Sequence, residues 1–241
     1  MMMSAASGRR GLTWAIIGGI VLVVGVVAII VASTISRSPG QAEPTHTSTA
    51  DSSSPTQTAD TVVDPTASAH GWIPEPVTTH ADTYIRTALE AASTFDTRKS
   101  TRGQWLNYLD SWFTPDTRYQ EPDRADRMKA AQLELRQGVV LPREDWDSLA
   151  GENGRVVAVS AGEITDVPVS GDTSGHMRIG TTTVTLTFTR SDASGTETSY
   201  DERARVSVQV LCGDGSLPTP DTPQTAGDCK VVRYFTEPME P

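Results

Sequence analysis

Apolar residues fill one unbroken stretch near the start of the chain, Gly11–Ile35, with the sequence GLTWAIIGGIVLVVGVVAIIVASTI. It carries no charged residue, and it is long enough to cross the hydrocarbon core of a membrane, which needs about 20 apolar residues. The apolar region of a cleaved signal peptide is shorter, about 7–15 residues. We therefore expect a single transmembrane helix here, and the alternative is a signal peptide cleaved near Val31-Ala32-Ser33.

Basic residues predict the orientation of this helix. Arg9 and Arg10 lie on its N-terminal side, whereas Arg37 is alone on the far side, ahead of a polar and acidic segment. Because positively charged flanks stay in the cytoplasm, we expect residues 1–10 to form a cytoplasmic tail and the large C-terminal part to lie outside. This layout predicts a single-pass protein of the plasma (inner) membrane.

Small and polar residues follow the apolar stretch. Residues 36–77 are rich in Ser, Thr and Pro and contain few large apolar residues. Such a composition buries too little apolar surface to offset the entropy of ordering the chain. We expect a disordered linker over 36–77 and a folded extracytoplasmic domain over 78–241.

Helical periodicity begins after this linker, with apolar residues at steps of three and four. Proline and glycine at the segment ends, and a serine or threonine at one start, indicate where the helices begin and end. The expected helical segments are His80–Thr97, a second from Ser100 or Thr101 to before Pro115, a third from Pro122 to Gly138, and a short turn at Pro142–Leu149.

The apolar pattern changes to alternation at Arg155. The expected strands are Arg155–Val169, His176–Arg190, Tyr200–Cys212 and Lys230–Thr236, followed by a frayed tail. In the second strand, valine, leucine and phenylalanine alternate with threonines, which is typical of a half-buried antiparallel strand with a threonine-coated outer face. Helices followed by strands predict an α+β domain, in which helices pack on a curved, cone-like antiparallel sheet of about four strands.

Charge and cysteine content narrow the classes of function. The formal net charge is -10, which argues against a nucleic-acid surface because phosphate binding needs a basic patch. The cysteines are Cys212 and Cys229, both beyond the predicted membrane helix. An even number of cysteines in an oxidising compartment predicts a disulfide. A metal or redox pair is the weaker alternative, because the sequence has no CxxC and no adjacent histidine.

Catalytic and cofactor-binding motifs are absent from the sequence, including GxSxG, HExxH, the P-loop and GxGxxG. We therefore predict no enzyme activity, no cofactor and no bound metal. The alternative is proton transfer in a cavity by His176, which follows Asp172 in a turn. Tyr108 and Tyr119 are candidate partner or pocket contacts, since half-exposed aromatic side chains favour interfaces. Trp112 is a third such candidate, although its helical spacing favours the core.

The layout as a whole resembles a known family. The stretch Gly11–Ile35, the helix His80–Thr97 and the strands around Val184–Phe188 and Val206–Val210 resemble the nuclear-transport-factor-2-like cone fold on a membrane tether. This combination is similar to the bitopic scaffold subunit of type IV secretion and conjugation machines. It is also similar to membrane-anchored proteins associated with actinobacterial Mce lipid-import systems.

The resemblance covers about residues 78–236 and brings no catalytic residues with it. It implies a non-enzymatic assembly subunit whose outer domain contacts envelope proteins or further copies of itself. The alternatives are a tethered cone domain that binds or converts a small molecule in its cavity, and a tethered sensor for another ligand.

Overall fold

The computed structural model describes residues 61–241. The predicted membrane helix, Gly11–Ile35, and residues 36–60 of the predicted linker lie outside these residues. Within 61–241, none of the helices has both the length and the apolar character that a membrane span requires.

Helices precede strands along the described chain, with one short exception. The helical elements are η1 (Ala67–His70), α1 (Ala81–Ala91), α2 (Arg102–Asp110), α3 (Asp123–Glu134), η2 (Leu135–Val139) and α4 (Arg143–Gly151). The strands are β1 (Phe95–Asp96), β2 (Arg155–Val167), β3 (Met177–Ser191), β4 (Glu197–Leu211) and β5 (Lys230–Tyr234). The predicted α+β class is confirmed.

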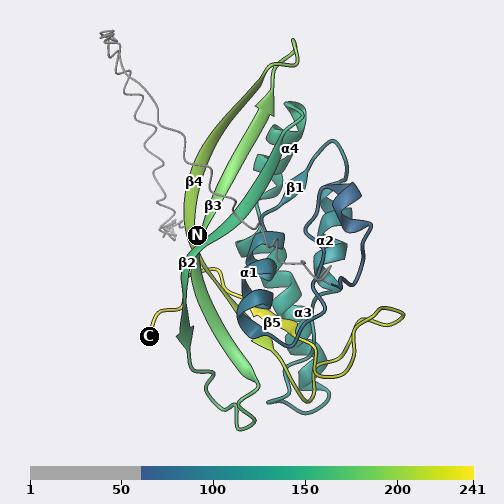
Figure 1. Ribbon diagram of the computed structural model, residues 1–241, viewed down its shortest axis with the longest axis vertical. Helices are drawn as coiled ribbons and strands as arrows, with labels where there is room; N and C mark the ends of the chain where they lie inside the picture. Colours follow the sequence, from purple (N-terminus) through teal and green to yellow (C-terminus); the bar gives the residue numbers. More distant parts are fainter. Residues whose placement is uncertain (1–60) are drawn as a thin grey trace, which may run out of the picture. The chain divides into compact units, whose positions relative to one another are not determined.

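The strands form one antiparallel sheet in the order β1-β2-β3-β4-β5. Figure 1 shows β2, β3 and β4 as long curled strands with the helices on one side, and the β3–β4 hairpin extends beyond the helices. The sheet has five strands instead of about four. The extra one, β1, is only Phe95–Asp96, which is too short to show an alternating pattern in the sequence.

Helix α1 ends earlier than predicted. It stops at Ala91, and the chain then turns so that Phe95–Asp96 can pair with the start of β2, with Phe95 opposite Val156. The start of α2 agrees with the sequence: Thr101 caps it and forms a capping box with Gln104.

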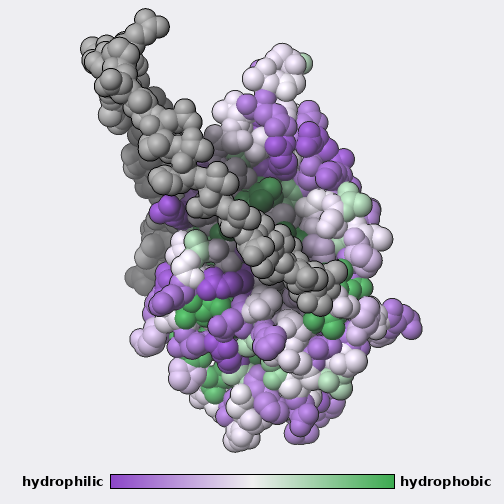
Figure 2. Space-filling model, viewed as in Figure 1, coloured by the Kyte–Doolittle hydropathy of each residue, from purple (hydrophilic) through white to green (hydrophobic). Residues whose placement is uncertain are grey.

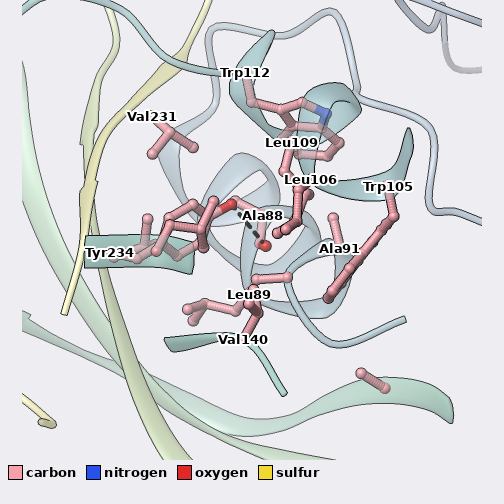
Figure 3. Close-up of a cluster of buried hydrophobic side chains, with 14 of the residues drawn as sticks. Ala88, Leu89, Ala91, Trp105, Leu106, Leu109, Trp112, Val140, Val231 and Tyr234 are labelled. Atoms are coloured by element: carbon pink, nitrogen blue, oxygen red, sulfur yellow. Dashed lines mark hydrogen bonds between the residues drawn. The ribbon is translucent and has the colours of Figure 1, made fainter. Parts of the chain in front are cut away.

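Aromatic side chains fill the space between the helices and the sheet. Trp105, Trp112 and Tyr234 are completely buried, and Trp105 stacks on Trp146 of α4. Figure 3 shows this cluster, in which the hydroxyl of Tyr234 donates a hydrogen bond of 3.1 Å to the carbonyl of Ala88. Burying one large apolar side chain contributes about 1.5–3 kcal/mol, so the cluster is a major source of stability.

Residues 61–77 fold with the domain, which corrects the predicted end of the linker. The amide of Val63 donates to the carbonyl of Glu75 (2.8 Å), and the indole of Trp72 donates to the hydroxyl of Ser100 (2.8 Å). The side chain of Glu75 is completely buried. The composition of this segment resembles a linker, but the side chains of Trp72 and Ile73 pack against the hydrophobic core.

The C-terminal tail packs on the outer face of the sheet, where a frayed end was predicted. Met239 accepts a hydrogen bond from Thr181 (2.6 Å) and donates one to the hydroxyl of Ser207 (2.8 Å). Glu240 forms an ion pair with Arg205. The tail thereby covers Thr181, which is completely buried. The predicted threonine-coated outer face is therefore not solvent-exposed at this end of β3.

Candidate functional site

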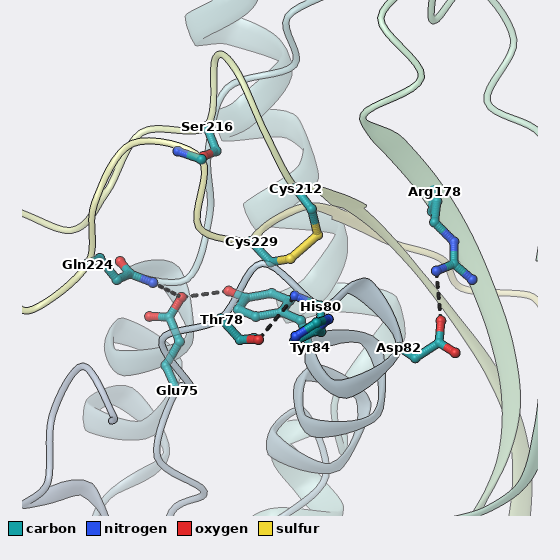
Figure 4. The surroundings of a disulfide bond; sticks show 11 residues. Glu75, Thr78, His80, Asp82, Tyr84, Arg178, Cys212, Ser216, Gln224 and Cys229 are labelled. Atoms are coloured by element: carbon teal, nitrogen blue, oxygen red, sulfur yellow. Dashed lines mark hydrogen bonds and ion pairs between the residues drawn. A yellow bond between two sulfur atoms is a disulfide. The ribbon is translucent and has the colours of Figure 1, made fainter. Parts of the chain in front are cut away.

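The predicted disulfide between Cys212 and Cys229 is present. Cys212 follows β4 and Cys229 precedes β5, so the bond closes the loop 213–228 at its base (Figure 4). Closing a loop of this length stabilises the fold by about 3 kcal/mol on the chain-entropy estimate.

A buried ion pair lies next to this disulfide. The Lys230 Nζ atom is 2.9 Å from Glu75 Oε1, and the two side chains are 1% and 0% exposed. The same carboxylate oxygen accepts hydrogen bonds from the Tyr84 hydroxyl (2.5 Å) and the Gln224 amide (3.1 Å), as Figure 4 shows. These four side chains, together with the backbone around them, form the buried polar cluster.

The ammonium group of Lys230 has further acceptors on the helical and loop sides. It donates to the carbonyl of Ser111 (2.8 Å) and to the hydroxyl of Thr219 (2.8 Å). Burial lowers the pKa of Lys230 and raises the pKa of Glu75, while the attraction between the two charges opposes both shifts. Within residues 61–241, Glu75 Oε2 has no hydrogen-bond partner, which is consistent with the upward shift of the pKa.

The buried polar cluster joins three parts of the chain. Glu75 belongs to the segment 61–77, Tyr84 to α1, and Gln224 and Lys230 to the disulfide loop and β5. The acid and the base are both closed off from water. The arrangement therefore holds the three segments together.

Sequence patterns did not reveal this cluster. Glu75 lies in the segment that composition assigns to a linker, and alternation places Lys230 on one face of a strand without showing that this face is buried. One feature of the sequence indicates it: Lys230 lies between Cys229 and the apolar pair Val231-Val232, which is an unusual position for a charged residue.

His176 and Asp172 do not form the proton-transfer pair that the sequence suggested. The carboxylate of Asp172 accepts hydrogen bonds from Ser174 and from the amide of Met177, and no hydrogen bond or ion pair joins it to His176 within residues 61–241. The imidazole packs over Gly213, where an added Cβ would lie 2.8 Å from His176 Cγ. His176 therefore packs beneath the disulfide loop.

Two of the candidate aromatic contacts belong to the packing of the domain. The Tyr108 hydroxyl donates to the carbonyl of Ile73 (2.8 Å) and accepts from the amide of Glu75 (3.0 Å), and its ring stacks on Trp72. Trp112 has no exposed surface. Tyr108 thus ties the segment 61–77 to α2, and Trp112 is part of the core.

Tyr119 lines a pocket of about 280 Å³ between α3, residues 116–119 and the last two strands. Two arginines of this pocket, Arg118 and Arg233, are each paired with a carboxylate. A third, Arg127, lies 3.7 Å over the Tyr119 ring, within the range of a cation–π contact. The pocket is polar and half-open, with charges that largely balance.

An apolar pocket of about 260 Å³ lies between η2, β1 and the inner face of β2 and β3. Phe95, Val140, Val156, Leu186 and Phe188 contribute most of its apolar wall, and none of its lining residues is ionisable. The pocket has room for a small apolar group but offers no acid or base.

Side chains of α1 and the turn after it close one edge of the sheet. Glu90 accepts a hydrogen bond from the amide of Ser160 (2.8 Å), and Thr94 accepts one from the amide of Ala158 (3.0 Å). Further along, Arg86 donates to the carbonyl of Gly162 (2.7 Å). Three main-chain groups of β2 are therefore satisfied by side chains of α1 and of the turn after it.

The opposite edge is different. Strand β4 pairs with β3 over its whole length, but with β5 only from Val208 to Leu211. Residues 197–207 thus have no strand on their outer side within the described part of the chain. We call this segment the free edge of β4.

Exposed apolar residues are scattered over the described surface, and Figure 2 shows mostly polar residues on the visible face. Val157 and Val159 are neighbours on the outer face of β2. Among residues 61–241, no group of histidines, cysteines and carboxylates has the arrangement of a metal site.

The described part of the chain is thus an α+β unit in which helices pack against a curled five-stranded half-barrel. No protein-family model matches the chain, and no curated protein is similar to it in sequence.

Comparison with solved structures finds three that are similar to this chain. An IcmL-like type IV secretion system protein from Legionella pneumophila has 13% identity and a TM-score of 0.40, covering 65% of this chain and 88% of its own. CagV from Helicobacter pylori, described as a VirB8 homolog, has 14% identity and a TM-score of 0.35, covering 64% and 92%. A periplasmic fragment of TraM has 11% identity and a TM-score of 0.36, covering 62% and 89%.

The first two are described as proteins of type IV secretion systems, the class that the sequence resemblance names. At TM-scores of this size, the similarity does not define what the chain does.

Proposed function

We propose that this chain is a non-enzymatic, membrane-tethered scaffold or assembly subunit of a bacterial envelope transport or conjugation complex of the type IV secretion kind. The outer domain acts through protein contacts. The observation that carries this proposal is the buried polar cluster. Its acid, Glu75, and its base, Lys230, bond to each other, and Lys230 also bonds to Ser111 and Thr219, so the two groups connect segments of the fold.

The membrane tether is the second part of the proposal. Gly11–Ile35 anchors the chain, residues 1–10 lie in the cytoplasm, and the unit 61–241 lies outside. The Cys212–Cys229 disulfide supports this placement, since disulfides persist in oxidising compartments.

Cysteine labelling tests the topology. The chain's two cysteines are bonded to each other, so an introduced cysteine is the free thiol. A membrane-impermeant maleimide is expected to label Ser194→Cys, in the exposed β3–β4 turn, in intact cells from which any outer membrane has been removed. The matched variant Ser4→Cys is expected to react only after lysis. The reverse pattern would refute the proposed orientation.

Crosslinking in cells tests the assembly role. The full-length chain is tagged, treated with a mild amine crosslinker and purified, and residues 1–60 alone serve as the matched control. Envelope proteins are expected with the full chain and not with the control. A full-length chain that is recovered without any other envelope protein would contradict the proposal.

The apolar pocket of about 260 Å³ favours a second candidate function, the binding of a small apolar molecule. A fluorescent probe such as anilinonaphthalene sulfonate tests it. Leu186→Trp fills the pocket, whereas Val159→Trp adds the same ring on the outer face of the sheet. If the pocket is a binding site, only Leu186→Trp abolishes probe binding. Equal binding by the two variants would exclude this function.

A further inference from the structure

We propose that the free edge of β4, residues 197–207, pairs antiparallel with the free edge of a second copy of this chain and joins two sheets into one. The inference rests on the proposed function, in which the outer domain acts through protein contacts, and it names the surface and the partner.

From residue 199 to residue 205 of this edge, every second residue points its main-chain groups outward without a partner within residues 61–241. Phe235 donates to the carbonyl of Ser207, so the peptide groups of Ser207 face away from β3. Along an antiparallel strand, every second residue faces the same neighbour. The outward-facing residues are therefore Ser199, Asp201, Arg203 and Arg205, and no hydrogen bond within residues 61–241 engages their main-chain groups on the outer side.

The two edges of the sheet differ in how far other parts of the described chain cover them. The edge formed by β2 is closed by Glu90 and Thr94, which accept from its free amides. Residues 197–203 of the free edge have no such cover from the described chain, and all of them are exposed. An uncovered edge with unpaired main-chain groups is a template for another strand.

The charge pattern of the edge selects a second copy as its partner. Acidic residues occupy the first half (Glu197, Asp201, Glu202) and basic residues the second (Arg203, Arg205). When two such strands pair antiparallel about a two-fold axis, the acidic half of each lies against the basic half of the other. Parallel pairing would instead place acid against acid.

The central charges are available for such contacts. Arg203 and Glu202 form no ion pair within the described part of the chain, and Asp201 accepts a hydrogen bond only from Thr187. For any two-fold axis between residues 201 and 203, Asp201 lies opposite or diagonal to Arg203 of the second copy, at distances at which cross-strand side chains interact.

The C-terminal tail contacts this edge only at its end, where Phe235 bonds to Ser207 and Glu240 pairs with Arg205. Within residues 61–241, no hydrogen bond or ion pair joins the tail to residues 197–203. The β3–β4 hairpin extends beyond the helices, and β4 lies at the rim of the sheet in Figure 1. Anchoring in one membrane would raise the local concentration of two copies, which favours a contact of moderate area.

Thiol crosslinking of the full-length chain in its membrane tests the pairing. Asp201→Cys and Arg203→Cys each place the free thiol on the free edge, and a short bismaleimide links two thiols that are close together. We expect covalent dimers for both variants, at least tenfold more than for Ser194→Cys in the exposed turn. Equal yields at all three positions, or none on the edge, would overturn the proposal.

A charge exchange tests the role of complementarity, with Ser199→Cys as the crosslinking site. Asp201→Arg and Arg203→Asp each place like charges together and should lower the dimer yield at least fivefold. The double variant Asp201→Arg/Arg203→Asp restores opposite charges and should return the yield to within twofold of the starting protein. Asp214→Arg, outside the edge, is the matched control. If the double variant gives a dimer yield as low as the single variants, the two strands do not pair through complementary charges.

These outcomes separate this inference from the proposed function. If envelope proteins crosslink to the full chain but edge thiols yield no dimer, the assembly role stands and self-pairing is wrong. If edge thiols crosslink to a different protein, the edge is a docking strand for that protein and the second copy is refuted. A dimer without any other envelope protein would refute the assembly role alone.

Discussion

Glu75 and Lys230 each supply the counter-charge that allows the other to be buried. Removing a charge from water costs several kcal/mol, and the cost is offset only when a counter-charge and hydrogen bonds replace the lost water. The ammonium group of Lys230 has several such partners, whereas one oxygen of Glu75 has none in the described part of the chain. The pair is therefore more sensitive to loss of one partner than to loss of both.

Breaking the pair is expected to destabilise the domain strongly. Lys230→Met leaves the Glu75 carboxylate buried and unpaired, which should lower the free energy of unfolding by about 3–5 kcal/mol. The double variant Glu75→Leu/Lys230→Met should cost less than the sum of its single changes. Urea unfolding followed by tryptophan fluorescence measures all of these. Lys129→Met, at an exposed ion pair with Asp126, is the control and should change little. Equal losses for Lys230→Met and Lys129→Met would contradict the prediction.

The pKa shift of Glu75 predicts a pH dependence. Burial raises the pKa of Glu75 above its ordinary value of 4.5, although Lys230 opposes the shift. Between these two pKa values the folded chain binds more protons than the unfolded chain, so the contribution of Glu75 to stability falls as pH rises. Glu75→Gln cannot titrate. The stability of the unsubstituted protein minus that of Glu75→Gln should therefore decrease as pH rises above about 4.5, measured by urea unfolding. Parallel pH curves would show that the pKa of Glu75 is unshifted.

Helix α1 uses its apolar residues to pack on the core and its polar residues to bond to the edge of β2. Tyr84, Ile85, Ala88 and Leu89 are buried, as the helical period predicts. Arg86 and Glu90, one turn apart, lie along the β2 edge and bond its main chain. The apolar stripe could be identified from the sequence. The edge contacts could not, because they require knowing which strand lies beside the helix.

Removing one of these edge contacts should loosen β2 locally. Glu90→Ala leaves the amide of Ser160 without its acceptor, which should cost about 1–2 kcal/mol and speed hydrogen exchange at that amide. Glu90→Gln retains an acceptor oxygen and should lose much less. Hydrogen exchange followed by NMR reports both. If Ser160 exchanges at the same rate in Glu90→Ala and in the unsubstituted protein, the contact does not stabilise the edge.

The disulfide connects the ends of β4 and β5. Replacing both cysteines, as in Cys212→Ser/Cys229→Ser, should lower the free energy of unfolding by about 3 kcal/mol because the loop is no longer closed in the unfolded chain. Thermal unfolding with and without a reductant measures the effect. Reductant should destabilise the unsubstituted protein and leave the double variant unchanged. A similar response of both proteins to reductant would contradict this account.

At the scale of the whole molecule, the folded unit starts earlier than composition suggests. Amides of Val63 and Val77 are bonded to main-chain carbonyls in an antiparallel bridge. Peptides from 62–77 should therefore be protected in hydrogen-exchange mass spectrometry. Trp72→Ala removes the stack on Tyr108 and the hydrogen bond to Ser100, and should reduce this protection. Complete exchange of 62–77 within seconds in the unsubstituted protein would instead support the predicted disordered linker over 36–77.

The general architecture was predictable, because periodicity is a local property. The helices-then-strands order and the tryptophan core follow from patterns within a short window. The disulfide follows from the number of cysteines and their position beyond the predicted membrane helix. The exceptions depend on distant partners: residues 61–77 and the C-terminal tail become ordered by hydrogen bonds to remote residues such as Ser100 and Ser207. A two-residue strand such as β1 is likewise decided by its neighbour β2.

The separation of Glu75 and Lys230 along the chain has a consequence for biogenesis. The two residues are 155 positions apart, and loop 213–228 closes over them near the end of the sequence. A nascent chain that emerges N-terminus first exposes Glu75 and its tryptophan-rich helices until β5 has been made. Folding of this unit can therefore be completed only after β5 has been synthesised, and loss of residues 230–241, which include Lys230, should yield a substrate for chaperones and proteases instead of a shorter domain.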